Sequence, residues 1–474
     1  MTLRDLIGEG APAAEISGLA YSSGSVEPGY LFFCVRGFKA DGHDYAPDAV
    51  ERGAAALVCE RPLGLGVPEH VVPDARAAMG PLAARFYGDP TETLRVAGVT
   101  GTNGKTTTTY LLRAILEAAG ERTGLLGTVT SIVGGRAEPV ERTTPEAIDL
   151  QRNFRRMLDA GDTACAMEVS SHALDLRRTD GIHFATRVFT NLTQDHLDFH
   201  PSMEAYFQAK RRLFEGGAPS IVNVDDEYGR RLAAELPDAT TYAIECDAGY
   251  RALNVEFDPG GSRFTCATPD GEVRVTTRLP GLFNVQNALA AAAAARSLGV
   301  PLDTAVEALA RADRVPGRFE PVDEGQRFTA LVDYAHTPDS LDNVLRAARQ
   351  ITRGRLHVVF GAGGDRDRSK RPQMGEVASR LADRVIVTSD NPRSEDPDSI
   401  VDQILAGTGP DAEREPDRRR AIELAMTSAA PGDVVVVAGK GHEQGQEFEG
   451  GRKEPFDDVT VVREALRATQ GAAH

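Results

Sequence analysis

Long apolar runs are missing from this sequence of 474 residues. No segment approaches the run of about 20 apolar residues that a membrane-spanning helix needs. The first ten residues include Arg4, Asp5 and Glu9, so they do not resemble the apolar core of a secretory signal. We therefore expect a cytoplasmic protein that has no membrane partner.

Cysteine is scarce, and the spacings that bind metals are absent. The five cysteines include no CxxC pair, and several lie in apolar segments that are typical of strands. This pattern favours buried thiols over zinc ligands or disulfides.

A basic excess is also lacking, because 53 Lys and Arg residues face 70 Asp and Glu residues and the net charge is -17. A general nucleic-acid binder needs a basic face, so nucleic acid is not an expected partner. Any anionic ligand must be held by a few local Arg and Lys side chains.

What is present is a globular composition, 41% apolar and 26% charged, in a chain long enough for about three domains. Apolar strand-like segments alternate with helical patterns, which predicts α/β layers. Asp74 is expected to cap a helix, and Thr144 followed by Pro145 predicts a helix start. Polar or proline-glycine hinges predict boundaries near residues 92 and 316. We expect strands over 30–35, 54–59, 94–100, 164–169, 187–191, 220–223, 330–334, 356–360, 384–389 and 433–438, and helices over 105–119 and 287–298.

A glycine-rich segment, GVTGTNGKTT at 98–107, lies between a predicted strand and a predicted helix. Glycines let backbone N–H groups approach phosphates, and a helix N-terminus adds partial positive charge. Lys105 would reach the terminal phosphates of a nucleoside triphosphate, and the Thr106 hydroxyl would bind magnesium. The spacing is GxxGxxGKT, with valine where the strict Walker pattern has glycine. A tight strand-to-helix turn without a ligand is the alternative.

Carboxylate and imidazole groups follow two further predicted strands. Glu168 ends one strand, and His196 lies in the segment after the next. Such groups beside a phosphate loop are candidate magnesium ligands. At strand ends they also serve as ordinary hydrogen-bonded residues, so this interpretation depends on the nearby loop.

Taken together, these motifs closely resemble the Mur ligases of peptidoglycan synthesis. The resemblance covers nearly the whole chain. It is carried by GVTGTNGKTT, MEVSSHAL at 167–174, TNLTQDHLDFH at 190–200, GLFNVQN at 281–287, VPGRFE at 315–320, DYAHTP at 333–338 and GKGHE at 439–443. Within the family, TTP at 143–145, GGDRDR at 363–368 and DNPR at 390–393 resemble the branch that adds the third peptide residue.

The resemblance implies an α/β protein of three domains. A smaller N-terminal α/β domain at 1–92 would bind a UDP-sugar. A central domain at 93–316 would bind ATP on a P-loop-type parallel sheet. A C-terminal domain at 317–474 would bind an amino acid on a Rossmann-like doubly wound sheet.

It also implies an ATP-dependent ligase that serves cell-wall formation. ATP would phosphorylate the D-Glu side-chain carboxylate of UDP-N-acetylmuramoyl-L-Ala-D-Glu, and the amine of meso-diaminopimelate would displace the phosphate. Magnesium would be the cofactor, and we expect a monomer.

The family pattern implies roles for individual residues. Lys105, Lys210, His196 and Glu168 would be catalytic. Magnesium would be bound by Thr106, Glu168, His196 and Lys210, the last as a carbamate, because a bare ammonium would repel the metal. The ATP site would comprise Gly101, Thr102, Asn103, Gly104, Lys105, Thr106, Thr107, Asn287, Arg318 and His336.

The remaining matched positions would bind the other two substrates. The UDP-sugar dipeptide would contact Ser23, His43, Thr143, Thr144, Ser170 and Arg178. Relatives usually have Asp-Ser-Arg where this chain has Ser22-Ser23-Gly24, so a simple polar turn is the alternative there. The amino acid would contact Arg366, Asp390, Asn391, Pro392, Arg393, Gly439 and Glu443.

Arg393 argues for diaminopimelate, because a guanidinium suits the distal carboxylate that lysine lacks. The lysine-adding ligase stays open as an alternative, as do a folylpolyglutamate-type ligase and a P-loop kinase. A regulatory module that has lost catalysis would be expected to lack Lys105, Glu168, His196 or Lys210, and all four are present.

Overall fold

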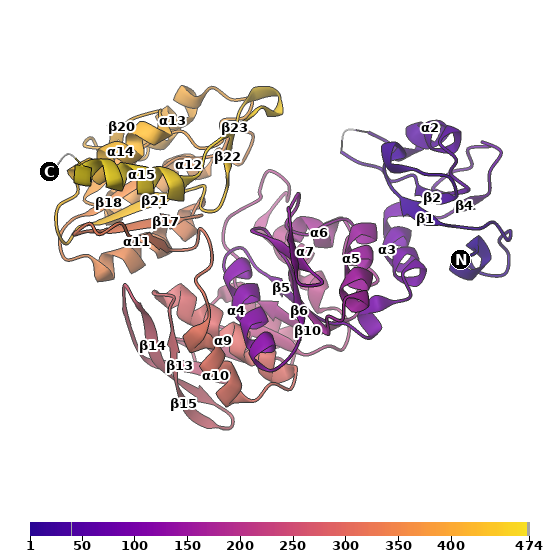
Figure 1. Cartoon of the computed structure of the whole chain (residues 1–474), viewed down its shortest axis with the longest axis horizontal. Coiled ribbons are helices and arrows are strands. Elements are labelled where there is room, and N and C mark those ends of the chain that lie inside the picture. Colours follow the sequence, from indigo (N-terminus) through magenta and orange to yellow (C-terminus); the bar gives the residue numbers. More distant parts are fainter. Residues whose placement is uncertain (39, 472–474) are drawn as a thin grey trace. The chain divides into compact units, whose positions relative to one another are not determined.

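The computed structural model describes residues 1–38 and 40–471. The backbone divides into two units. The first contains Met1–Thr100, Ala119–Val188 and Ala209–Pro219, and the second contains Gly101–Ala118, Phe189–Gln208 and the chain from Ser220 onward. Figure 1 follows the chain by colour through both units.

The first unit begins with a small parallel sheet in the order β1-β2-β3-β4. Its strands are β1 (Gly18–Ala20), β2 (Tyr30–Phe33), β3 (Ala56–Cys59) and β4 (Glu69–Val71). Its helices are α1 (Leu3–Ile7), α2 (Ala46–Glu51) and α3 (Ala75–Phe86), with short turns η1 (Ser23–Ser25) and η2 (Gly42–Tyr45). Asp74 caps α3 as predicted, because its side chain accepts a hydrogen bond from the backbone N–H of Ala77.

The rest of the first unit carries the strand that leads into the glycine-rich loop. Its strands follow the order β10-β5-β9-β6-β7-β8. They are β5 (Arg95–Thr100), β6 (Thr123–Leu126), β7 (Ser131–Val133), β8 (Arg136–Glu138), β9 (Ala164–Glu168) and β10 (Phe184–Phe189). The helical elements here are η3 (Pro90–Glu92), α5 (Ala147–Asp159), α6 (Ser171–Asp175) and η4 (Arg212–Phe214). Because β5 and β9 pair in parallel with Val99 opposite Glu168, the Glu168 carboxyl lies beside the strand end that precedes the loop.

The second unit contains the helix that follows this loop, α4 (Lys105–Ala118), which packs on α9 (Leu282–Ser297). Its strands run in the order β15-β14-β13-β12-β11. They are β11 (Ser220–Asn223), β12 (Thr240–Ala243), β13 (Tyr250–Asp258), β14 (Gly261–Thr268) and β15 (Gly271–Thr277). The other helices are α8 (Glu227–Glu235), α10 (Leu302–Arg311) and α7 (Met203–Arg211), whose residues from Ala209 onward belong to the first unit. β13, β14 and β15 are antiparallel, a part of the fold that the sequence did not predict.

The C-terminal part of the second unit is a six-stranded sheet in the order β16-β17-β21-β18-β19-β20. The strands are β16 (Glu320–Val322), β17 (Thr329–Asp333), β18 (Leu356–Phe360), β19 (Arg384–Val387), β20 (Glu413–Arg414) and β21 (Val434–Ala438). The helices are α11 (Pro338–Ile351), α12 (Lys370–Leu381), α13 (Pro397–Leu405), α14 (Arg418–Ser428) and α15 (Asp458–Gly471). A hairpin of β22 (Gly445–Glu447) and β23 (Lys453–Pro455), with the turn η5 (Glu449–Gly451), lies between β21 and α15.

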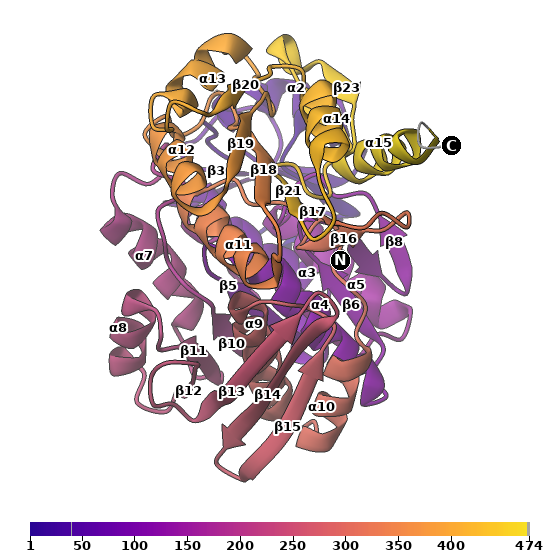
Figure 2. The ribbon, with the colours of Figure 1, turned by 90° about the vertical axis from the view of Figure 1, so that its left-hand side faces the viewer.

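This C-terminal sheet is covered on both faces, as the doubly wound prediction requires. Alternate residues of one strand enter different cores: Val436 packs with α11, α12 and α13, whereas Val435 and Val437 pack with α14 and α15. Figures 1 and 2 show the two sets of helices on opposite sides of the sheet. In such a sheet, ligands bind at the carboxyl ends of the strands.

The structure confirms all ten predicted strands, with ends shifted by a few residues. The predicted helix start at Thr144–Pro145 is wrong, because α5 begins at Ala147 and the Thr144 hydroxyl donates to the Glu168 carbonyl oxygen instead. The helix predicted over 287–298 begins earlier, at Leu282. The domain boundaries near 92 and 316 stay predictions.

The structure also bears on the predictions about the cysteines and about membrane-spanning helices. Cys34, Cys59, Cys165 and Cys266 are buried free thiols, while Cys246 is partly exposed. Across residues 1–38 and 40–471, no helix combines the length and apolarity needed to cross a membrane.

Candidate active site

The glycine-rich loop joins β5 to α4 in a conformation that requires glycine at two positions. Gly101 has φ +152°, and a Cβ there would lie 1.8 Å from the Thr190 hydroxyl oxygen. Gly104 has φ +87°, and a Cβ there would lie 2.4 Å from Oδ1 of Asn287. The loop backbone is therefore packed tightly against 190–191 and α9, with the N-terminus of α4 directly after it.

Lys105 bends back over this loop. Its Nζ donates to the carbonyl oxygens of Gly101 at 2.9 Å and Thr102 at 2.8 Å. The Asn103 backbone N–H donates to Oδ1 of Asn191 at 2.9 Å, so the TNLTQDH segment supports the loop from outside. The loop thus has the fixed shape and the cation that a phosphate site needs.

Arg318 reaches the same place from the start of the C-terminal part. Its Nη2 donates to the Thr106 hydroxyl at 3.1 Å, and its guanidinium lies 4.4 Å from the ring centre of Tyr334. Asn287 also contacts α4, since its Oδ1 accepts from the Thr108 hydroxyl at 3.3 Å. These contacts bring Arg318 and Asn287 together with the loop.

Replacing Gly101 with alanine is expected to abolish most ATP-dependent activity, because the methyl group would overlap the Thr190 hydroxyl at 1.8 Å. Gly120 is the matched control: its φ is also positive, +90°, but open space surrounds it. Gly120→Ala should lower stability by about 1 kcal/mol and leave activity intact. Equal loss of activity in both variants would contradict a steric requirement of the loop.

In the first unit, the side chain of Glu168 is held by residues that the sequence did not single out. The Thr128 backbone N–H donates to Oε1 at 2.7 Å, and the Thr128 hydroxyl donates to Oε2 at 3.0 Å. A Cβ on Gly127 would lie 2.5 Å from Oε1. Each carboxylate oxygen keeps a further lone pair, so the group can still accept a metal ion.

Thr144 and its neighbours surround the end of β9. The Thr144 hydroxyl lies 3.3 Å from the Ser170 hydroxyl, and the Ser170 side chain caps α6. Thr143 contacts the Thr128 hydroxyl at 3.0 Å. The Arg178 guanidinium donates to the Thr144 carbonyl oxygen at 3.1 Å, and its Nε lies 3.0 Å from a Glu146 carboxylate oxygen. The structure therefore brings together four of the residues predicted to bind the UDP-sugar dipeptide.

Ser23 and His43, the two N-terminal residues predicted to bind the UDP-sugar dipeptide, differ in burial. Ser23 begins η1 and is partly exposed. The ring of His43 is buried: Nδ1 lies 2.5 Å from Oδ1 of Asp41, and Nε2 accepts from the Glu60 backbone N–H at 2.9 Å. Burial raises the pKa of Asp41, but hydrogen bonds from His43 outweigh burial and hold this pKa at about 2. Both ring nitrogens of His43 thus bind within the chain, so the ring fixes the shape of this loop.

His196, in the second unit, adopts a left-handed conformation with φ +55°. Its backbone N–H donates to Oδ1 of Asp195 at 2.9 Å, and its Nε2 lies 3.4 Å from Oδ2. Burial alone would raise the pKa of Asp195, but His196, His336 and Lys370 hold it well below its usual range. Burial lowers the pKa of His336, whose Nδ1 lies 2.7 Å from the Tyr334 carbonyl oxygen.

Lys210 lies in the last turn of α7 and is 1% exposed. A buried ammonium is costly unless it is paired or chemically changed. The burial therefore shows that Lys210 is not an ordinary solvent-exposed lysine on the surface of α7.

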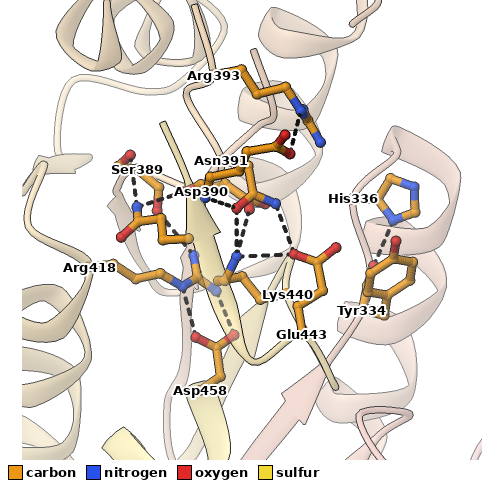
Figure 3. A network of polar contacts seen from close by, with 12 residues as sticks. Tyr334, His336, Ser389, Asp390, Asn391, Arg393, Arg418, Lys440, Glu443 and Asp458 are labelled. Carbon is orange, nitrogen blue, oxygen red and sulfur yellow. Dashed lines mark hydrogen bonds and ion pairs between the residues drawn. The ribbon is translucent and has the colours of Figure 1, made fainter. Parts of the chain in front are cut away.

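Polar residues around Asn391, Arg393 and Glu443 form a further cluster, called the third cluster below. It lies at the carboxyl ends of β19 and β21 and is shown in Figure 3. Nδ2 of Asn391 donates to Oε2 of Glu443 at 2.8 Å. Nε of Arg393 donates to Oε2 of Glu447 at 3.0 Å, and its Nη1 donates to the Gly364 carbonyl oxygen at 2.8 Å. Three N–H groups of the Arg393 guanidinium remain for a carboxylate.

Neighbouring residues complete this cluster. Arg366 is exposed, and a Cβ on Gly363 would contact both Arg366 and Arg393, so the two arginines flank one position. Gly439 has φ +122°, and a Cβ there would lie 2.7 Å from Oδ2 of Asp390. Pro392 forms the turn between Asn391 and Arg393. The predicted amino-acid residues are thus assembled at one edge of the sheet.

The chain is similar to known protein families, individual proteins and solved structures. The Mur ligase middle domain matches residues 99–295, the Mur ligase glutamate ligase domain matches 317–441, and the pattern described as Mur ligase family, catalytic domain, matches 15–87. The chain belongs to the Mur ligase family.

Individual Mur ligases resemble the chain over almost its full length. UDP-N-acetylmuramoyl-L-alanyl-D-glutamate--2,6-diaminopimelate ligase from Geobacillus thermodenitrificans is 49% identical over 468 residues, covering 96% of this chain and 95% of that protein. A solved structure of a ligase with the same name has a TM-score of 0.73 at 33% identity, covering 99% of both chains. A MurF ligase from Thermotoga maritima, solved in complex with ADP, shares the fold with a TM-score of 0.67 at 19% identity, covering 97% of this chain and 99% of that one.

Several residues of this Mur ligase were missed by the sequence reasoning. Thr128 holds Glu168, Tyr334 stacks on Arg318, and Lys440 contacts both Asn391 and Glu443. Tyr334 and Lys440 lay inside quoted motifs, DYAHTP and GKGHE, so their places beside assigned residues were a partial signal. Thr128 has no such signal, because a threonine after a strand is common.

The described residues of this Mur ligase contain no group of three or more His, Cys, Asp and Glu side chains that could hold a metal ion.

Proposed function

We propose that this Mur ligase joins 2,6-diaminopimelate to UDP-N-acetylmuramoyl-L-Ala-D-Glu with ATP as co-substrate. The observation that carries the proposal is the 49% identity to a ligase of that name across 96% of this chain. The DNPR turn supports the choice of amino acid, because Arg393 offers N–H groups to a distal carboxylate. We place the reaction in the cytoplasm, where ATP is available, and propose a monomer.

The reaction begins with a carboxylate, which is a poor acyl donor. The D-Glu side-chain carboxylate would attack the γ-phosphorus of ATP, so that an acyl phosphate forms and ADP leaves. The amine of diaminopimelate would then attack the acyl carbon, and phosphate would leave as the amide forms. This sequence requires two anions to meet, so positive charge at the phosphates is the main requirement.

The chain supplies much of that charge itself. Lys105, Arg318 and the N-terminus of α4 would face the phosphates of ATP, and His336 would lie near them. The loop glycines give the backbone N–H groups access. The N–H groups of 102–105 would orient the phosphates for transfer.

Magnesium would be held, on family likeness, by Thr106, Glu168, His196 and a carbamate on Lys210. Thr106, Glu168 and the carbamate would offer the oxygen ligands that magnesium prefers, and His196 would add a nitrogen ligand. When bound, magnesium would neutralise charge on the phosphate oxygens. A carbamate would convert the buried Lys210 cation into an oxygen ligand, and a peptide mass without the added carbon dioxide would contradict this assignment.

The test is an amide-formation assay with ATP, magnesium and the UDP-dipeptide, with meso-diaminopimelate or lysine added in parallel. We expect phosphate release that depends on both the UDP-dipeptide and diaminopimelate. Equal or greater use of lysine would overturn the assigned amino acid. Phosphoryl transfer without an amide product would overturn the ligase.

Replacing Arg393 with alanine is expected to raise the KM for diaminopimelate by about 100-fold, because a charge-assisted hydrogen bond to its distal carboxylate would be lost. The KM for ATP should stay within about twofold of the original value. Arg452→Ala is the control, because Arg452 is an exposed arginine in the neighbouring hairpin that pairs with Glu454. An unchanged KM for diaminopimelate would show that Arg393 only shapes the turn.

A further inference from the structure

Lysine is rare in this chain, and several of its lysines lie in the glycine-rich loop or in the interior. Six lysines stand among 53 Lys and Arg residues. Lys105 lies in the phosphate loop, Lys453 is exposed, and Lys210, Lys370 and Lys440 are buried. Because arginine serves nearly everywhere else, a buried lysine indicates a position that needs a compact ammonium instead of a planar guanidinium.

Lys440 has no solvent exposure, and Figure 3 shows it at the centre of the third cluster. Its Nζ donates to Oδ1 of Asn391 at 2.8 Å and to Oε2 of Glu443 at 3.0 Å, and it lies 3.6 Å from Oδ1 of Asp390. One ammonium thus contacts three of the residues assigned to the amino-acid site.

These contacts fix the orientation of two side chains. Oδ1 of Asn391 accepts from Lys440 and from the Glu447 backbone N–H at 3.0 Å, which leaves Nδ2 to donate to Glu443. Oε2 of Glu443 accepts from both Asn391 and Lys440, and the Glu443 side chain is 31% exposed. Among the described residues, no hydrogen bond reaches Oε1 of Glu443.

Lys440 also stabilises the charged form of Asp390. Asp390 is buried, and burial would raise its pKa, but Lys440 and Arg418 hold this pKa below its usual range. Asp390 and Glu443 thus bring two carboxyl groups to the one Lys440 amino group. This excess of carboxyl groups, with Oε1 of Glu443 still available, suits a substrate ammonium.

We propose that Lys440 is a positioning residue that holds the Glu443 carboxylate for the distal ammonium of diaminopimelate. This inference rests on the proposed function, which supplies the substrate. Lys440 itself would not touch the amino acid, because its Nζ is enclosed by Asp390, Asn391 and Glu443. Its effect would pass through the orientation of Glu443.

The test compares meso-diaminopimelate with 2-aminopimelate, which keeps the distal carboxylate but lacks the distal ammonium. In Lys440→Met, the KM for diaminopimelate should rise by about 10- to 100-fold, while the KM for 2-aminopimelate should change less than about threefold. The preference for diaminopimelate would therefore collapse. A purely structural role of Lys440 would raise both KM values alike.

Two further variants keep the test decisive. Glu443→Gln should reduce the same preference, and Lys440→Met combined with Glu443→Gln should be little worse than either single variant. If Lys440→Met does not fold, Lys440→Met with Asp390→Asn removes the opposite charge as well, and its substrate preference is measured instead. The KM for ATP reports the intact loop in every variant.

The outcomes separate the two proposals. If the unaltered protein ligates diaminopimelate but the preference survives in Lys440→Met, the inference fails and the proposed function stands. If Glu443→Gln keeps the preference, the inference also fails. If the unaltered protein forms no amide with diaminopimelate, both fail.

Discussion

Replacing Lys105 with methionine is expected to lower kcat by about 100- to 1,000-fold, the range seen when one preorganised donor is removed from a site that stabilises developing charge. The substitution removes the ammonium that donates to the Gly101 and Thr102 carbonyl oxygens. Because the methionine side chain has nearly the same length as that of lysine, little else changes. Single-turnover formation of ADP measures the chemical step. ATP binding is measured separately, because loss of the loop shape would weaken binding as well.

The matched control is Lys453→Met, which removes the same charge from an exposed position in β23. It should leave kcat within about twofold of the unaltered value. If Lys105→Met retained most of its activity, the loop would not be the phosphate site, and the proposed chemistry would need another cation.

Replacing Asp458 with asparagine is expected to lower the free energy of unfolding by about 3–5 kcal/mol, because the Arg418 charge would lose its buried partner. Arg418 and Asp458 are both buried and are joined by bonds of 2.8 and 2.7 Å, shown in Figure 3. Arg418 also donates to the carbonyl oxygens of Ser389, at 3.4 Å, and Ala438, at 3.0 Å. The pair therefore ties the ends of β19 and β21 beneath the DNPR turn and the GKGHE segment.

The neighbouring pair of Arg419 and Glu464 joins the same two helices in an exposed position, at 2.6 Å. Glu464→Gln should change the free energy of unfolding by less than about 1 kcal/mol, because solvent screens this pair. Urea unfolding followed by far-ultraviolet circular dichroism measures both variants. Equal effects at Asp458 and Glu464 would show that burial does not control the strength of the pair.

Local pattern predicted the strands well, and the reason is visible in the cores. β21 is a run of apolar residues that is buried on both faces, so its sequence could hardly form anything else in an α/β protein. The antiparallel strands β13, β14 and β15 were not predicted, because polar and charged residues interrupt them and no continuous apolar segment marks them. Their pairing depends on contacts between segments, not on one segment alone.

The false helix start at Thr144 shows the same limit. Thr144 and Pro145 have the residue types of a helix cap and a first helical turn. The Thr144 hydroxyl, however, donates a hydrogen bond to the Glu168 carbonyl oxygen. A local capping preference of about 1 kcal/mol can be overridden by a tertiary hydrogen bond of similar strength. The position of β9, which ends at Glu168, decides which of these two hydrogen bonds the Thr144 side chain makes.

The candidate site divides in the same way. The glycine-rich loop could be found from spacing, because its glycines, Lys105 and Thr106 act together over a few residues. Lys440 could not be assigned from spacing, because its role depends on Asn391, which lies 49 residues away in the chain. The role of Thr128 likewise depends on Glu168, at a separation of 40 residues.

By itself, the sequence therefore determined the α/β class and the family membership, and it located the glycine-rich loop that we propose binds phosphates, since each depends on neighbours along the chain. The tertiary structure decided which side chains support the assigned residues: Thr128 at Glu168, Asp41 and Glu60 at His43, and Lys440 at Glu443. Hydrogen bonds and buried charges act over a few ångströms in space, whatever the separation in sequence. That short range is why only the folded chain could reveal them.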